Sequence, residues 1–88
     1  MAQIQLGFFS AKELGKAIRA ERKALGRTQQ WVADQCQIRV ATVSDVENGK
    51  NATVFTVMTV LNALGKGLKI VDRHVALDQI QDLFDEDD

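Results

Sequence analysis

The placement of small and apolar residues between positions 29 and 48 constrains this chain most. Two short helices that cross at a tight turn need a small residue where they approach, an apolar residue filling the turn, and apolar residues facing inward. Ala33 meets the first need, and Ile38 stands at the turn. The inward positions hold Val32, Cys36, Val43 and Val46. The segment therefore predicts a helix over 29–36, a turn, and a short helix over 40–48.

Helices are also predicted on both sides of this pair. Ser10-Ala-Lys-Glu13 has the spacing of a capping box, in which hydroxyl and carboxylate satisfy backbone amides at a helix start. The helix that begins there has an apolar stripe interrupted by one charge, and Gly26 should end it; the stripe comprises Leu14, Ala17, Ile18, Glu21 and Leu25. Thr53 should cap a fourth helix through Leu64, whose inward face comprises Val57, Met58, Leu61 and Leu64.

The region after the fourth helix predicts one strand and a weak last helix. Leu68-Lys69-Ile70-Val71 follows a glycine turn and is too short for a helix. Because an unpaired strand edge recruits partners, we expect this strand to pair with its copy in a second subunit. Residues 76–84 form the weak helix, and 85–88 should be disordered. The expected fold is all-α, with four to five helices and one short C-terminal strand that pairs across a dimer.

Composition excludes several classes of protein. The only cysteine, Cys36, rules out an internal disulfide and a Cys-x-x-Cys site, so we expect a reduced, intracellular protein without metal or cofactor. No apolar run reaches the about 18 residues of a membrane span, which predicts a cytoplasmic chain. A chain of 88 residues has little room for a deep catalytic cleft, and His74 has no partners at catalytic spacing, so we do not expect an enzyme.

The net charge of −1 conceals two oppositely charged regions. Residues 1–71 hold ten Lys and Arg against five acidic residues, a net charge of +5. Residues 72–88 hold one Arg against seven acidic residues, a net charge of −6. A basic body therefore carries an acidic tail, and the body has the sign that nucleic-acid binding requires.

The pattern resembles that of the phage-repressor-type, or XRE/Cro-type, helix-turn-helix regulators. Thr28-Gln29, Ala33, Thr42-Val43-Ser44 and Glu47-Asn48-Gly49 match the family's motif, and the resemblance covers about residues 11–67. It implies that Arg22 and Glu47 form a structural ion pair between helices; two independent surface charges are the alternative. One residue departs from the pattern: Gln37 occupies a turn position that is usually glycine, where a left-handed conformation costs about 1 kcal/mol.

The motif also assigns candidate DNA contacts. The second helix of such a pair enters the major groove, and the start of the first meets phosphate. Gln29 and Gln30 are therefore candidate phosphate contacts, as are Lys50 and Asn51 in the next loop. The groove-facing set comprises Arg39, Val40, Ala41, Ser44 and Asp45. For each of these residues the alternative is a solvated surface position. Trp31 stands next to them, and we expect it to pack partly against the first or fourth helix; an interface role is the alternative.

Within the family, the chain resembles HipB-type antitoxins in its size, its Phe8 to Leu14 start, Ala41-Thr-Val-Ser44, and the strand predicted after the fourth helix. The resemblance implies a nucleoid-associated homodimer that represses its own operon at a palindromic operator and binds a HipA-like kinase toxin. We divide the chain into an N-terminal extension over 1–9, a DNA-binding domain over 10–67, a dimerisation strand over 68–72, and a partly disordered acidic tail over 73–88.

Two functions other than an antitoxin are alternatives. One is a stand-alone regulator without a toxin, and the other is a protein-interaction module that has lost DNA binding. Asp45 and the acidic tail favour the module, whereas the basic body and the filled contact positions favour a DNA-binding protein. The resemblance implies that the tail is a toxin contact or a site of protease access; a solubilising, disordered terminus is the alternative.

Overall fold

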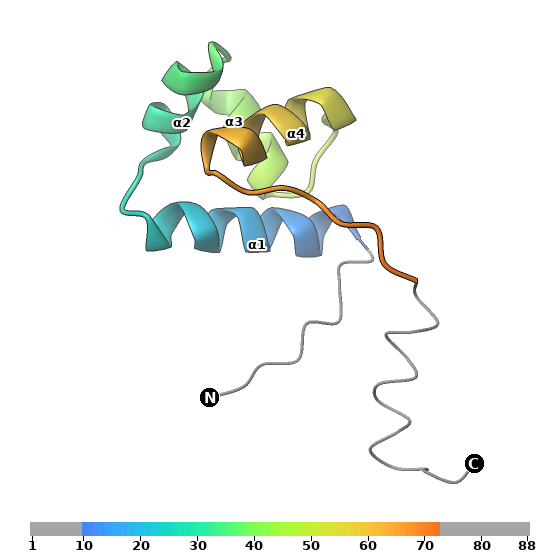
Figure 1. The fold of residues 1–88 in the computed structure, drawn as a ribbon. Helices are drawn as coiled ribbons and strands as arrows, with labels where there is room; N and C mark the ends of the chain where they lie inside the picture. The colour runs from blue at the N-terminus through green and yellow to red at the C-terminus, as the bar shows by residue number, and fades with distance from the viewer. Residues whose placement is uncertain (1–9, 73–88) are drawn as a thin grey trace, which may run out of the picture.

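The computed structural model describes residues 10–72, which form four helices (Figure 1). These are α1 (Ala11–Ala24), α2 (Gln29–Cys36), α3 (Val40–Glu47) and α4 (Val54–Ala63). The all-α prediction is confirmed. The N-terminal extension, the last predicted helix over 76–84 and the predicted acidic tail from residue 73 lie outside the described residues.

Side-chain caps fix where three of the helices begin. Ser10 Oγ accepts a hydrogen bond from the backbone N–H of Glu13 at 3.1 Å. Thr28 Oγ1 accepts from Trp31 N–H at 3.0 Å, and Thr53 Oγ1 accepts from Thr56 N–H at 3.0 Å. Each bond satisfies an amide that the helix leaves without an intrahelical partner. The predicted starts of α1, α2 and α4 follow from these caps.

All four helices contribute to one core. Its buried members are Ile18, Val32, Ala33, Val43, Val46, Val60, Leu61 and Leu64. The predicted inward stripe of α1 is wrong at Leu25, which is 51% exposed. Leu25 is the C-cap of α1 and stays on the same side of the helix as Ile18, but it lies at the end of α1, where the other helices no longer cover it. The predicted face of α4 omitted Val60, which is fully buried.

Two glycines let α1 pack tightly against the region around α3. A Cβ on Gly15 would lie 2.5 Å from the backbone oxygen of Glu47, which is closer than side-chain carbons approach such atoms. Gly49 has a φ of +70°, and a Cβ there would lie 2.6 Å from Lys12 Cα. Glycine is required at both positions, at Gly49 for its backbone conformation as well. The contact fixes α3 relative to α1.

The chain after α4 runs along α1 (Figure 1). Lys66, Gly67 and Leu68 line a pocket of about 190 Å³ together with Leu14, Ala17, Ile18, Glu21 and Leu61. Residues 68–72 form no strand within the described part of this single chain, and Ile70 is 98% exposed. The expected partner of that strand is a second chain, so the strand pairing stays a prediction. Over residues 10–72, no helix has the length and apolar character needed to cross a membrane.

Candidate nucleic-acid interface

The turn between α2 and α3 has the tight geometry that the sequence predicts. Gln37 has φ 59° and ψ 45°, a left-handed conformation, and it is the only non-glycine residue with positive φ between residues 10 and 72. The N–H of Ile38 donates to the carbonyl of Ala33 at 3.0 Å, which closes the turn. The chain therefore accepts the strain of a glutamine where a glycine would be relaxed, because the helix crossing depends on this conformation.

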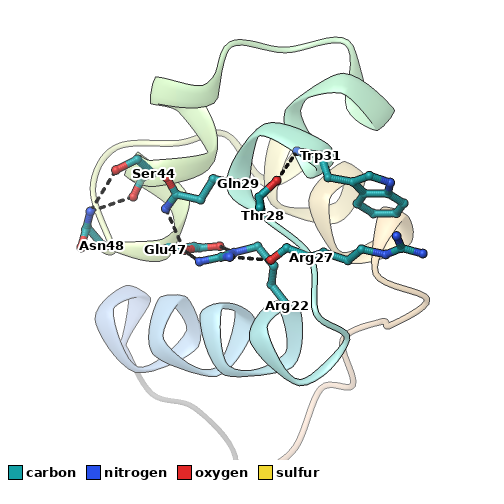
Figure 2. Close-up of polar contacts among 8 residues, drawn as sticks. All are labelled: Arg22, Arg27, Thr28, Gln29, Trp31, Ser44, Glu47 and Asn48. Atoms are coloured by element: carbon teal, nitrogen blue, oxygen red, sulfur yellow. Dashed lines mark hydrogen bonds and ion pairs between the residues drawn. The ribbon is translucent and has the colours of Figure 1, made fainter.

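A buried ion pair joins α1 to the end of α3 (Figure 2). Arg22 Nε donates to Glu47 Oε2 at 2.7 Å, and Arg22 Nη2 donates to Glu47 Oε1 at 3.1 Å. Arg22 Nη1 donates to the carbonyl of Arg27 at 2.7 Å. The two side chains are 8% and 2% exposed. Because the pair is bidentate and shielded from water, it sets the orientation of α3 on α1 and also holds the α1–α2 turn.

Gln29 belongs partly to this network, a role that differs from the expected phosphate contact. Its Nε2 donates to Glu47 Oε1 at 2.9 Å, and the residue is half-buried at the first position of α2. The side chain thus points toward α3 rather than freely outward (Figure 2). Gln30, the next residue, is exposed, and its Nε2 donates to Asp34 Oδ1 at 2.9 Å. Of the two glutamines, Gln30 is the one whose side chain is accessible to a ligand.

The first turn of α3 is its most accessible part. Arg39, Val40 and Ala41 are exposed, and Arg39 occupies the N-cap position without a side-chain capping bond. Ser44 and Asp45, one turn later, are half-buried. The side-chain amide of Asn48 donates to the Ser44 carbonyl at 2.9 Å and to its Oγ at 3.2 Å. The predicted groove-facing set therefore divides into three open residues and two that lie closer to the body of the domain.

The loop after α3 presents the remaining candidates. Lys50 and Asn51 are both exposed. The backbone N–H of Lys50 donates to the Asp45 carbonyl at 2.8 Å, so the start of the loop is tied to the last turns of α3. Gly49 packs against the start of α1. Lys50 therefore projects from an anchored backbone, which suits a residue that fixes position on a phosphate chain.

One exposed contact was missed by the sequence reasoning. The Arg27 guanidinium lies 4.3 Å from the centre of the Trp31 ring, next to the start of α2 (Figure 2). Trp31 is half-buried and packs on the core, so packing accounts for it. The signal was the spacing: Arg27 and Trp31 are four residues apart across a helix start, close enough for the cation to lie on the ring.

Cys36 lies between α2 and α4, away from the exposed turn of α3. The Cys36 Sγ donates to the Thr59 carbonyl at 3.5 Å, and burial raises the pKa of this thiol. The side chain thus acts as a packing residue between α2 and α4. Over residues 10–72, no three His, Cys, Asp or Glu side chains gather in a way that would hold a metal ion.

Comparison with known proteins places this geometry among DNA-binding regulators. A family model described as helix-turn-helix matches residues 18–71, which include the end of α1 and all of α2 to α4. No curated protein sequence is significantly similar to the chain.

Solved structures provide closer relatives. The chain is similar to HipB in the HipA-HipB-O2-O3 complex, with 29% identity, a TM-score of 0.68, and coverage of 82% of this chain and 97% of the other. The HipB-O4 20mer complex gives the same values. The clp gene regulator ClgR from C. glutamicum, at 23% identity and a TM-score of 0.62 over 84% of this chain and 91% of the other, shares the fold.

Proposed function

We propose that this chain, which belongs to the helix-turn-helix family, is a sequence-specific DNA-binding repressor that binds a palindromic operator as a dimer. One observation carries the proposal. The exposed first turn of α3 projects from a helix that a buried bidentate ion pair fixes relative to α1. A rigid helix with accessible N-terminal residues is what base reading in the major groove requires.

The contacts divide by chemistry. Arg39 offers the planar donor group that pairs with guanine, while Val40 and Ala41 offer the apolar contact that suits a thymine methyl group. Ser44 and Asp45 follow deeper along the same helix, and Asp45 would accept from a cytosine amino group. Gln30, Lys50 and Asn51 contact the phosphate chain, and Gln29 contributes through its backbone N–H at the start of α2.

Binding to the DNA upstream of the chain's own gene, measured against salt concentration, tests this proposal. We expect a negative slope of log affinity against log salt, because Lys and Arg displace counterions from phosphate. Replacing Arg39 with Ala should relax the preference for the operator over unrelated DNA. Lys50→Ala should instead weaken all sequences alike and reduce the slope by about 1. No binding at low salt would overturn the proposal, and identical behaviour of the two variants would overturn the assignment of contacts.

The partner is the second part of the proposal. The chain acts as the antitoxin of a HipA-like kinase toxin and represses the operon that encodes both. The similarity to HipB supports this, because it extends over 97% of the HipB chain and includes a HipA-HipB complex. A stand-alone regulator would share the DNA-binding fold without the kinase partner, as the similarity of fold to ClgR illustrates.

Co-expression with a kinase-like protein encoded next to the gene separates these alternatives. An antitoxin should co-purify with the kinase and should relieve the growth arrest that the kinase causes when expressed alone. Arg39→Ala serves as the matched variant, since it should impair operator binding while leaving the complex with the kinase intact. A kinase that neither binds the chain nor is neutralised by it would leave the stand-alone regulator as the function.

A further inference from the structure

One face of α1 carries a stripe of basic side chains that the proposed DNA contacts do not use. Lys12, Lys16, Arg19 and Lys23 follow one another at spacings of four, three and four residues, and all are exposed. At about 3.6 residues per turn, they lie within about 60° of one another around the helix axis, along about 17 Å of its length. We call these four residues the basic stripe.

The basic stripe is exposed beside the face of α1 that packs on the rest of the domain. The buried residues of α1, which are Gly15, Ile18 and Arg22, are centred about 100° from the stripe around the helix axis, and α3 packs there. Figure 1 shows α1 along one side of the domain, with α2, α3 and α4 on the other. Lys12 is the member of the stripe nearest the proposed DNA contacts, because Gly49, which precedes Lys50, packs against its backbone. Glu21 also points away from the stripe and pairs with Lys66 at 3.4 Å.

We propose that the acidic segment 72–88 of the same chain docks on the basic stripe. The charges are complementary, since the segment carries a net charge of −6 and the stripe presents four cations. The described chain reaches α1 on its other side, because Lys66, Gly67 and Leu68 line a pocket with Leu14 and Ala17, which lie about 130–170° from the centre of the stripe around the helix axis. The segment must therefore turn around α1 to reach the stripe. The sixteen residues after Asp72 reach up to about 50 Å when extended, which exceeds the length of the stripe.

Docking would change how the body of the chain meets DNA. The residues up to 71 carry a net charge of +5, which attracts any duplex regardless of sequence. A docked acidic segment cancels much of that field on the face that does not read bases. It therefore lowers non-specific affinity and leaves the contacts of α3 available. Because the attraction is between exposed charges, it weakens as salt is added.

Paramagnetic relaxation enhancement tests the contact in the full chain. A spin label is attached at Asp88→Cys in a Cys36→Ala background, and amide signals of the ¹⁵N-labelled protein are recorded at about 20 mM and 500 mM salt, where the Debye lengths are about 20 and 4 Å. We expect the amides of α1 along the basic stripe to lose at least half their intensity at low salt and to recover at high salt. Replacing the four stripe residues with Gln should abolish the effect, whereas Lys50→Gln should leave it unchanged.

Three results would overturn the proposal. They are the absence of low-salt broadening on α1, broadening centred on α2 and α3, and broadening seen only between molecules when labelled and ¹⁵N chains are mixed. If the stripe variant does not fold, the segment is neutralised instead, by converting Asp82, Asp85, Glu86 and Asp87 to their amides. Broadening that survives in this second variant would also contradict docking. The experiment contains no DNA, so its outcome is independent of the proposed DNA binding.

Discussion

At Gln37 the fold requires a left-handed backbone conformation that is unfavourable for a residue with a side chain. A left-handed backbone brings the Cβ of an L-residue near its own carbonyl oxygen, at a cost of about 1–2 kcal/mol, and glycine avoids this cost. We expect Gln37→Gly to raise the free energy of unfolding by about 1 kcal/mol, as measured by urea denaturation. Gln35→Gly, at an exposed position within α2, is the matched control and should lower it by about 1 kcal/mol. A loss of stability in both variants would contradict this account.

Removing one partner of the Arg22–Glu47 pair should lower the free energy of unfolding, and by more than Gln37→Gly raises it. In Glu47→Ala, the Arg22 guanidinium stays almost fully buried and loses both of its hydrogen bonds to the carboxylate. Breaking a buried pair from one side costs about 3–5 kcal/mol, because a charge remains without its partner. We expect that loss in urea denaturation. The control replaces both residues with apolar ones of similar size, Arg22→Met with Glu47→Leu, and should lose less stability than Glu47→Ala alone. A greater loss of stability in the double variant would show that the unpaired buried charge is not the cause.

The sequence predicted which residues take part in this network better than it predicted the hydrogen bonds between them. The resemblance to the helix-turn-helix family indicated Arg22, Glu47 and the strained Gln37, because each stands at a position that the family's motif fixes. It missed the hydrogen bond from Gln29 to Glu47. The place of Gln29 at the start of a helix predicts a phosphate contact, and nothing in a linear pattern distinguishes an amide that turns inward from one that turns to solvent.

At the scale of elements, Gly15 governs how closely α1 approaches α3. A glycine within a helix costs about 1 kcal/mol relative to alanine, so Gly15→Ala would ordinarily stabilise α1. Here the added Cβ would lie 2.5 Å from Glu47 O and 2.6 Å from Val46 O, both backbone atoms. The helices must therefore separate, and we expect a net loss of about 2 kcal/mol or more in thermal or urea unfolding, as for other overpacked cores.

Gly67→Ala is the control for that variant. A Cβ added at Gly67 would meet no atom within 4 Å, and the backbone there has no positive φ, so this change should leave the free energy of unfolding nearly unaltered. If Gly15→Ala proved as stable as Gly67→Ala, the close approach of α1 and α3 would not be a constraint on the fold.

Element boundaries were predictable where a local interaction defines them. Ser10, Thr28 and Thr53 accept amide bonds at helix starts, and hydroxyl residues before an apolar period indicate such starts in any sequence. The close contact at Gly15 joins residues that are far apart in sequence, so no local pattern reveals it. The wrong assignment of Leu25 has a related cause: the apolar period continues to the C-cap of α1, and only the packing of the other helices decides that this position is left half exposed.

At the scale of the whole molecule, the segment after α4 leaves apolar side chains in water within a single chain. Ile70 is 98% exposed, and Leu68 and Val71 are 46% and 44% exposed. If these residues pair across a two-fold axis, the surface that one chain exposes is buried by its copy. We expect Ile70→Asp to shift the chain from dimer to monomer in analytical ultracentrifugation, because a charge at the centre of such an interface is left without a partner.

The same variant should lose affinity for a palindromic operator far more than for a half-site, since two recognition helices must be held about one turn of DNA apart for both half-sites to be read. Val54→Asp is the matched control: Val54 is also apolar and 76% exposed, but it lies in the first turn of α4 rather than in the proposed strand. Neither change should much lower the free energy of unfolding of the isolated monomer, because both side chains are exposed in it. A dimer that withstands Ile70→Asp but dissociates in Val54→Asp would move the interface from residues 68–71 to the start of α4.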